Sequence, residues 1–174
     1  MIVVLMGVTG SGKTTIGQLL AGRMHAVFAD ADNYHSAANK AKMAAGQPLN
    51  DQDREPWLER LNLLLGEWLH QGQSGVLACS ALKQSYRKTL LRYLPQGSVL
   101  FVWLDGSKDL IAGRLAERKN HYMNPGLLDS QFATLEPPSD ALRVVNDREP
   151  KEVVNEIMQF VKGEEEKAHG IQAV

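Results

Sequence analysis

The sequence predicts an α/β fold with a five-stranded parallel sheet, helices on both faces of that sheet and a lid insertion. Short apolar runs alternate with stretches of helical periodicity along the chain, which is the pattern of strand–helix–strand units. The first apolar run ends in a glycine-rich loop, and a helical pattern follows that loop directly. The length of 174 residues suits one domain, with 44% hydrophobic and 22% charged residues.

Five apolar runs have the length of strands. The first, residues 2–6, is apolar throughout, which is typical of a strand that is buried on both faces of a parallel sheet. The other expected strands are residues 26–29, 75–79, 99–104 and 142–145.

Helical periodicity lies between these runs. Ile16, Leu20 and Met24 recur at helical spacing in the first interval, and Leu58 and Leu61 begin the apolar face of the second helix. The expected helices are residues 14–24, 57–69, 85–94, 108–119 and 152–161.

Two polar segments that contain proline and glycine interrupt the alternation, residues 33–56 and about 119–140. Insertions of this length in a compact domain are usually binding loops or lids. We expect the first to bind substrate and the second to be a lid. Residues 163–174 include three successive glutamates and are expected to form a flexible tail of the single domain 1–174.

Charge and composition exclude several classes of protein. With 19 Lys and Arg against 20 Asp and Glu, the chain lacks the excess of basic residues that nucleic-acid binding favours. No apolar run reaches the ~18 residues of a membrane span, and residues 1–6 lack the basic leader of a signal peptide. Cys79 is the single cysteine, which excludes a disulfide framework. We expect a cytoplasmic protein that binds neither nucleic acid nor membrane.

The loop after the first expected strand matches the pattern G-x-x-x-x-G-K-[ST] in full. Glycines permit the sharp turn that points successive backbone N–H groups at phosphate oxygens. Lys13 is expected to reach the β- and γ-phosphates of ATP, and the Thr14 hydroxyl to bind Mg²⁺. The alternative is a chance match in a glycine-rich turn, which the flanking strand and helix argue against. The expected ATP-binding residues are Gly7, Val8, Thr9, Gly10, Ser11, Gly12, Lys13, Thr14 and Thr15.

Two carboxylates follow the second expected strand. Asp30 and Asp32 are two positions apart, which places both side chains on one face of an extended segment. One would support hydrated Mg²⁺, and the other would accept a hydrogen bond or a proton from an acceptor hydroxyl. The alternative is a pair of solvated loop acids, and the nearby phosphate loop favours the functional interpretation.

Basic side chains occur where phosphates and an anionic acceptor would need them. Arg114 and Arg118 share one helix face, from which we expect them to clamp the phosphates as part of the lid, with Arg118 catalytic. Lys83 follows the third strand, at the sheet edge where open α/β sheets bind ligands. Arg54 would match the two oxygens of an acceptor carboxylate. The alternative for each of these four basic residues is an ordinary surface charge. His35 is either a substrate contact or an ordinary loop histidine.

A phosphate loop alone does not distinguish a kinase from a nucleotide-dependent switch. The residues after the fifth strand, Asn146-Asp147-Arg148, do not match the guanine motif Asn-Lys-x-Asp. The third strand ends at Cys79, where such switches place an aspartate that holds Mg²⁺. These features favour a small-molecule kinase over a GTPase-like switch.

Several blocks of the sequence carry a resemblance that covers residues 4 to about 161. They are Leu5-Met6-Gly7-Val8-Thr9-Gly10-Ser11-Gly12-Lys13-Thr14, Asp30-Ala31-Asp32 with His35, Gly46-Gln47-Pro48-Leu49-Asn50-Asp51 with Asp53-Arg54, Cys79-Ser80-Ala81-Leu82-Lys83, Tyr86-Arg87, Arg114-Leu115 with Arg118-Lys119, and Gln131-Phe132-Ala133-Thr134-Leu135-Glu136. Together they resemble the gluconate kinases (gluconokinases) among the P-loop small-molecule kinases. The blocks that begin at Gly46 and Cys79 are the most specific to that family.

The resemblance implies a P-loop NTPase fold of the nucleoside-monophosphate-kinase type and phosphorylation of D-gluconate to 6-phospho-D-gluconate, dependent on ATP and Mg²⁺. It also implies a homodimer, which is common in this family. By analogy with the related shikimate kinases, Asp30 would lie near Mg²⁺ and Asp32 at the acceptor hydroxyl. The resemblance assigns the gluconate carboxylate to Arg54, with Lys83 and His35 nearby.

Overall fold

Five parallel strands form one sheet, in the order β2-β3-β1-β4-β5, in the computed structural model, which describes residues 1–117 and 125–170. In the central strand, Leu5 is in register with Ala78 on one side and Val102 on the other. The strands are β1 (Ile2–Met6), β2 (Val27–Asp30), β3 (Gly75–Ala78), β4 (Val99–Asp105) and β5 (Leu142–Val145). All five expected strands are present, which confirms the predicted parallel sheet.

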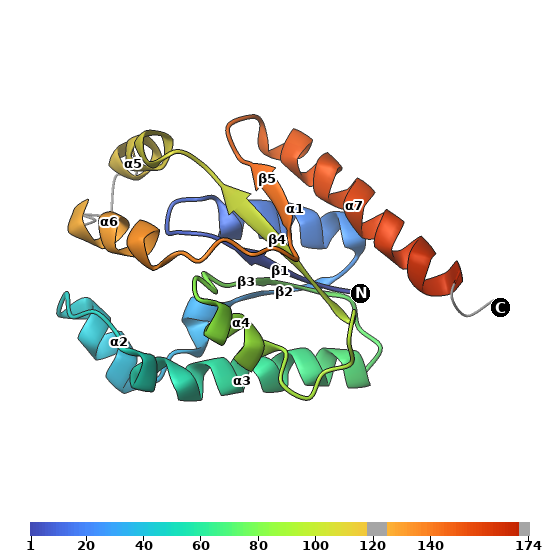
Figure 1. Cartoon of the computed structure of the whole chain (residues 1–174), viewed down its shortest axis with the longest axis horizontal. Helices are drawn as coiled ribbons and strands as arrows, with labels where there is room; N and C mark the ends of the chain where they lie inside the picture. The colour runs from blue at the N-terminus through green and yellow to red at the C-terminus, as the bar shows by residue number, and fades with distance from the viewer. Residues whose placement is uncertain (118–124, 171–174) are drawn as a thin grey trace.

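Helices cover both faces of the sheet, also as predicted (Figure 1). On one face α1 (Lys13–Met24) packs beside α7 (Pro150–Gly170), and on the other α3 (Asp51–His70) packs beside α4 (Gln84–Leu90). None of the described helices is long and apolar enough to cross a membrane. The shorter elements are η1 (Ala31–Tyr34), α2 (Ala37–Ala44), α5 (Lys108–Glu117) and α6 (Pro125–Thr134).

The continuous apolar run of β1 is explained by burial on both sides. Val3 and Leu5 pack in the cluster that contains the inner residues of α1 and α7, whereas Ile2, Val4 and Met6 pack against α3. All five side chains are fully buried. Because the strand alternates between two cores, an apolar residue is required at every position.

A third, smaller apolar cluster lies beyond the end of the sheet. It joins Val8 of the phosphate loop and Leu82, which follows β3, to Ile111 and Leu115 of α5 and Leu128 of α6. Helices α5 and α6 are therefore attached to the loop by a separate patch of apolar contacts.

Three helix boundaries differ from the predictions by more than two residues. Helix α4 ends at Leu90 rather than at residue 94. Helix α3 begins at Asp51 rather than at residue 57, because Asn50 and Asp53 form a reciprocal capping box that outweighs the backbone donor missing at Pro56. The expected insertion 33–56 is therefore partly helical, since it holds α2 and the first turn of α3.

Helix α7 continues past its expected end at Val161 as far as Gly170, so residues 163–170, which were expected to form a flexible tail, are helical. Glutamate is a good helix former, and Glu164 pairs with Lys167 one turn later at 2.6 Å.

Candidate active site

The loop between β1 and α1 turns sharply at two glycines. Gly10 and Gly12 have φ of 76° and 95°, in the left-handed region that favours glycine. A Cβ at Gly12 would lie 2.5 Å from Nδ2 of Asn146, and that amide donates a hydrogen bond to the Ser11 carbonyl at 2.7 Å. The loop is thus held closely against the segment that follows β5.

Lys13 lies folded over the start of the loop. Its ammonium group donates to the carbonyl oxygens of Gly7 at 3.0 Å and Val8 at 2.8 Å. Together with the N-terminus of α1, this group places positive charge on the side of the loop where phosphates bind.

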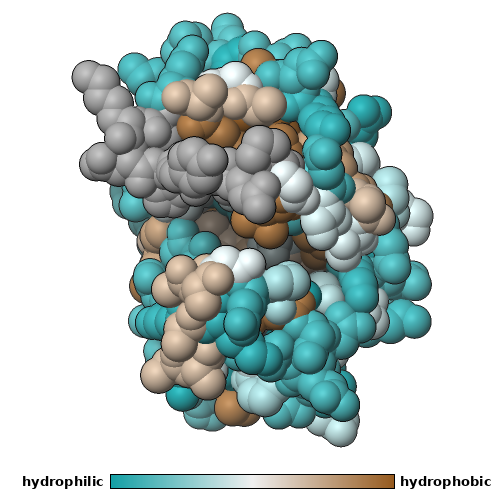
Figure 2. All heavy atoms as spheres, turned by 90° about the vertical axis from the view of Figure 1, so that its left-hand side faces the viewer, coloured by the Kyte–Doolittle hydropathy of each residue, from teal (hydrophilic) through white to brown (hydrophobic). Residues whose placement is uncertain are grey.

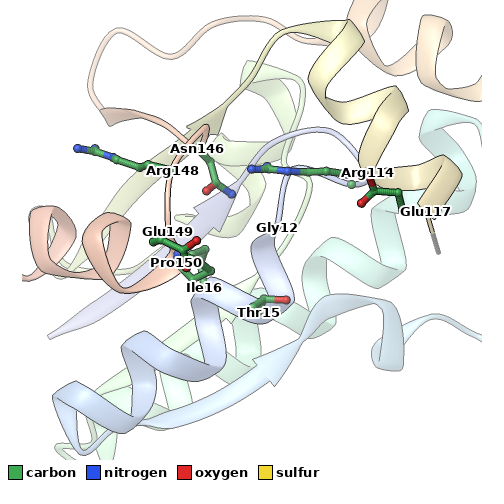
Figure 3. A pocket seen from close by; sticks show the side chains of 10 residues that line it. Gly12, Thr15, Ile16, Arg114, Glu117, Asn146, Arg148, Glu149 and Pro150 are labelled. Atoms are coloured by element: carbon green, nitrogen blue, oxygen red, sulfur yellow. The ribbon is translucent and has the colours of Figure 1, made fainter.

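A cavity of about 440 Å³ opens beside the loop (Figure 3). Arg114 extends from α5 towards Asn146, and Thr15 lies below them at the start of α1. The sequence had assigned Arg114 and Thr15 to ATP, but it had not assigned Asn146 or Arg148, which share no spacing motif with the loop. The lining residues are Gly10, Gly12, Thr15, Ile16, Arg114, Glu117, Asn146, Arg148, Glu149 and Pro150.

Thr14 and Asp30 meet next to the loop. The Thr14 hydroxyl donates to Oδ2 of Asp30 at 2.8 Å. Among the described residues there is no group of three or more His, Cys, Asp or Glu side chains that could hold a metal. Mg²⁺ in a nucleotide site needs only one or two protein oxygens besides phosphate and water. The Thr14–Asp30 pair supplies such hard oxygen donors, so its chemistry fits Mg²⁺.

The extended geometry expected for Asp30 and Asp32 is wrong. Asp30 ends β2, but Asp32 lies in the 3₁₀ helix η1, whose first turn is capped by the Asp30 carboxylate through the Asp32 N–H at 3.1 Å. Short polar side chains readily cap a turn in this way. The two carboxylates are therefore placed by a capped turn and not by strand alternation.

Lys13, Asp30 and Asp32 all act on the pKa of Cys79, which directly follows β3. Burial is the main cause that raises the pKa of the Cys79 thiol to about 12; Asp32 and Asp30 act in the same direction, whereas a backbone hydrogen bond with Ala81 and the charge of Lys13 oppose the rise. Lys13, Asp30 and Asp32 thus act on one point of the sheet edge. A thiol with this pKa is a neutral core group and not a nucleophile.

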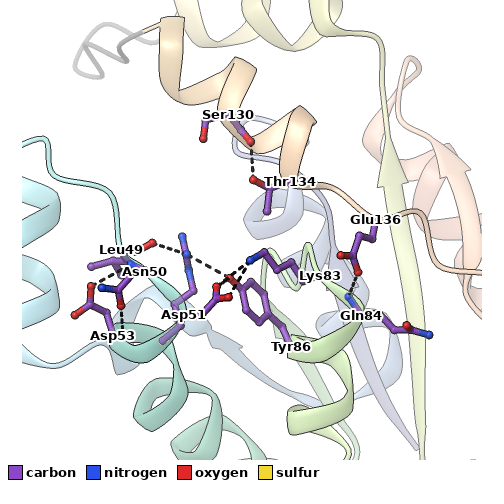
Figure 4. Close-up of polar contacts among 11 residues, drawn as sticks. Leu49, Asn50, Asp51, Asp53, Lys83, Gln84, Tyr86, Ser130, Thr134 and Glu136 are labelled. Atoms are coloured by element: carbon purple, nitrogen blue, oxygen red, sulfur yellow. Dashed lines mark hydrogen bonds and ion pairs between the residues drawn. The ribbon is translucent and has the colours of Figure 1, made fainter.

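A second polar cluster, the acceptor cluster, consists of Asp51, Arg54, Lys83 and Tyr86 (Figure 4). Lys83 contacts both carboxylate oxygens of Asp51 at 3.0 Å, and the Tyr86 hydroxyl donates to Oδ1 of Asp51 at 2.5 Å. Arg54 donates to the Tyr86 hydroxyl at 3.4 Å and to the Leu49 carbonyl at 2.6 Å.

The contacts of the acceptor cluster shift three pKa values. Hydrogen bonds from Tyr86 and then Lys83 lower the pKa of Asp51, and Asp51 in turn raises the pKa of Lys83. The pKa of Tyr86 is raised by burial and by its bond to Asp51. The sequence had assigned Arg54 and Lys83, and the structure brings them together. It had not assigned Asp51 or Tyr86, although both lie in the blocks of the gluconate kinase resemblance.

His35 is a buried side chain close enough to Asp32 and Arg54 for both charges to act on its pKa. Its ring stacks on Trp57 with centroids 4.3 Å apart, and the Trp57 Nε1 donates to the Ala31 carbonyl at 2.7 Å. Burial lowers the pKa of His35; Asp32 opposes this, whereas Arg54 and Lys40 add to it. The Nδ1 atom is buried and makes no hydrogen bond within the described residues.

The described part of the expected lid, residues 125–140, contacts the phosphate loop and the two residues on either side of Lys83. Gln131 of α6 accepts a hydrogen bond from the Thr9 N–H at 2.6 Å. Beyond the helix, Glu136 accepts from the Gln84 N–H at 2.6 Å and donates its own N–H to the Leu82 carbonyl at 2.9 Å. The sequence predicted no role for Gln131 or Glu136, although both lie in the last block of the gluconate kinase resemblance. Arg118 and residues 119–124 lie outside the described residues.

Figure 2 faces the end of the molecule that carries α2, α5 and α6 and shows this face hollowed across its middle. The side formed by α5 and α6 lies above the hollow, and the side formed by α2 and α3 lies below it. The phosphate loop follows β1 and the Lys83 end of the acceptor cluster follows β3, so both lie at the same end of the sheet. A kinase that acts on a small molecule has this arrangement, with one site for phosphates and a separate site for the acceptor.

Comparisons with known proteins agree with this class. The family model for shikimate kinase matches residues 9–162. A probable gluconokinase of Mus musculus is 45% identical, over 92% of this chain and 97% of the relative. The gluconokinase of Gluconobacter oxydans (strain 621H) is 42% identical, over 93% and 92%. The crystal structure of a gluconokinase from Sinorhizobium meliloti 1021 superposes with a TM-score of 0.86 at 36% identity, over 99% and 97%. The chain belongs to the gluconokinase family, within the wider group that the shikimate kinase model describes.

Proposed function

We propose that this chain transfers the γ-phosphoryl group of ATP to the 6-hydroxyl of D-gluconate and forms 6-phospho-D-gluconate and ADP. The observation that supports the proposal is the acceptor cluster, in which Lys83 is paired with Asp51 while the Arg54 guanidinium has neutral hydrogen-bond partners. The gluconokinase relatives support the identity of that acceptor.

The ATP site is assigned to the loop and the cavity beside it. The phosphates would be bound by the Lys13 ammonium and by backbone N–H groups of the loop and the start of α1, apart from those of Gly7, Thr9 and Ser11, which donate within the fold. The 440 Å³ cavity next to Arg114 and Asn146 would take the nucleoside. Arg118 is proposed as a further phosphate ligand, on the basis of the sequence alone. The Thr14 hydroxyl and the Asp30 carboxylate would hold Mg²⁺, which neutralises phosphate charge when it is bound.

The acceptor site is assigned to Asp32, His35, Arg54 and Lys83. The Arg54 guanidinium would bind the gluconate carboxylate, because its present partners, Leu49 and Tyr86, are neutral and leave its charge available. In the transfer step the 6-hydroxyl oxygen bonds to the γ-phosphorus, the bond to the β–γ bridging oxygen breaks, and the hydroxyl proton passes to Asp32.

Two further properties belong to the same proposal. We infer a homodimer, on the family resemblance, and a cytoplasmic location, where ATP is available. Light scattering on the purified chain measures the first property directly, with a monomeric mass as the contradicting result.

The proposed reaction is tested by ADP release with MgATP and gluconate, shikimate, AMP or no acceptor. We expect turnover with gluconate alone. Shikimate is the second candidate because the shikimate kinase model matches most of the chain. Turnover with shikimate in place of gluconate, or ADP release that needs no acceptor, would contradict the proposal.

The site assignment is tested with single variants in the same assay. Asp32→Asn should lower kcat by about 10²–10⁴-fold, the usual contribution of a general base. Arg54→Ala should raise KM for gluconate about tenfold or more while leaving KM for ATP nearly unchanged, since a charge-assisted hydrogen bond contributes about 1.5–3 kcal/mol. Arg23→Ala, an exposed arginine in the last turn of α1, is the matched control. Unchanged kcat/KM in both site variants would show that the assignment is wrong.

A further inference from the structure

The peptide group between Val8 and Thr9 is held at both ends by side chains. Its carbonyl oxygen accepts from the Lys13 ammonium at 2.8 Å, and its N–H donates to Oε1 of Gln131 at 2.6 Å. The C=O and N–H of a trans peptide point in opposite directions. Lys13 and Gln131 therefore lie on opposite sides of one rigid group.

Inside the loop the Val8 carbonyl also accepts a hydrogen bond from the Ser11 N–H at 3.2 Å, whereas the Thr9 N–H is held by Gln131, from outside the loop. Gly7 and Gly10 flank this peptide group with φ of 144° and 76°, and glycine gives the backbone on either side unusual freedom to rotate. A partly buried N–H that loses its acceptor is costly, so rotation towards water would follow the loss of Gln131. Such a rotation would take the Val8 carbonyl away from Lys13.

Gln131 is itself firmly placed. Leu128, one turn earlier in α6, is buried against Val8 in the third apolar cluster. On the other side, the Leu135 N–H donates to the Gln131 carbonyl, and Glu136 is tied to Leu82. Helix α6 is thus fixed to the loop by an apolar and a polar contact, and its C-terminal end is fixed to the acceptor side.

We propose that Gln131 is a positioning residue for phosphoryl transfer, which holds the Val8–Thr9 peptide so that its carbonyl keeps the Lys13 ammonium over the phosphate loop. The inference rests on the proposed kinase function, but it concerns the ATP half of the site alone. Gln131 acts through Lys13, so its effect on ATP should depend on Lys13 being present.

The test is a double-mutant cycle on MgATP affinity, measured by calorimetry without any acceptor. Gln131→Met keeps the length of the side chain and Gln131→Ala removes it, and both lose the acceptor oxygen. We expect either variant to weaken MgATP binding about tenfold, which corresponds to ~1.4 kcal/mol. In a Lys13→Ala background the same changes should alter the affinity less than twofold. Ser130→Ala, on the exposed side of the same helix, should have no effect in either background.

Steady-state kinetics provide the second readout. Gln131→Met should lower kcat with gluconate while leaving KM for gluconate within twofold, because the acceptor cluster is untouched. An equal loss of ATP affinity with and without Lys13 would overturn the proposal in favour of a merely structural role. Tighter ATP binding would also overturn it, since Gln131 would then compete with phosphate for the Thr9 N–H. If the unmodified chain did not phosphorylate gluconate, the proposed function would fail while the calorimetric cycle still tested Gln131.

Discussion

Asp51 organises the acceptor cluster from a single position. It pairs with Lys83 and accepts a hydrogen bond from the Tyr86 hydroxyl, and both contacts lower its pKa. The carboxylate thereby neutralises one of two nearby cations and leaves the charge of Arg54 for a ligand. A site with a single uncompensated positive charge suits a carboxylate better than a more highly charged phosphate group.

His35 should make the stability of the fold depend on pH near neutrality. Burial lowers its pKa below the ordinary value of 6.5, so between the two values the unfolded chain binds more protons than the folded one. The free energy of unfolding should therefore fall as the pH drops below about 6.5. Chemical denaturation at pH 7.5 and 5.5 measures this, and His35→Phe, which keeps an aromatic ring against Trp57, should show a smaller drop. Equal drops in both proteins would contradict the assignment to His35.

At the scale of elements, the start of α3 decides where the acceptor cluster lies. The capping box of Asn50 and Asp53 fixes the first turn, and that turn carries both Asp51 and Arg54. A helix beginning at Trp57 would leave these two side chains on an irregular segment. The cap thus links a local sequence signal to the geometry of the site.

Asn50→Ala should therefore affect stability and acceptor binding together. Loss of an N-cap side chain costs about 1 kcal/mol, measurable by urea unfolding. KM for gluconate should rise severalfold, and KM for ATP should stay within twofold because the phosphate loop lies between β1 and α1 and not on α3. Gln52→Ala, an exposed position in the same turn, is the control. A rise in KM for ATP as large as that for gluconate would be inconsistent with this account.

The sequence predicted correctly those elements whose local residue pattern and tertiary environment favour the same conformation. The apolar run of β1 and the glycine spacing of the phosphate loop are such cases, because burial on both faces and close phosphate approach leave few alternatives. The start of α3 was missed because Pro56 suggested a boundary. The geometry of Asp30 and Asp32 was missed because a capped turn replaced the expected extended segment.

The residues that the sequence did not assign are those defined by contacts across the fold. Asn146 meets Ser11, and Gln131 meets Thr9, across more than a hundred residues of chain. Neither contact follows a spacing rule, since the partners belong to different elements. Family resemblance had marked the block containing Gln131, but only the structure gives that residue a physical role.

At the scale of the whole molecule, the three apolar clusters differ in size. Two large clusters fill the faces of the sheet, whereas the third joins only α5, α6, the phosphate loop and Leu82. Elements held by few buried contacts open at lower free energy than the central sheet. The α5–α6 side should therefore be the least stable of the layers around the core.

Native-state hydrogen exchange tests this order of stability. Amides of Ile111 and Leu115 should exchange faster than those of Val4 and Leu77, and MgATP should slow exchange in α5 most because Arg114 lines the cavity proposed for the nucleoside. Uniform exchange from all four positions would show that the molecule opens as one unit.

The order of the strands has a consequence for how the chain folds during its synthesis. β1 pairs only with β3 and β4, which begin at Gly75 and Val99, so the segment bearing the phosphate loop must wait for partners made much later. Until then a fully apolar strand remains unpaired, and such segments are prone to aggregate. The central place of β1, which positions the loop so well in the finished enzyme, makes the folding of the nascent chain dependent on long-range pairing.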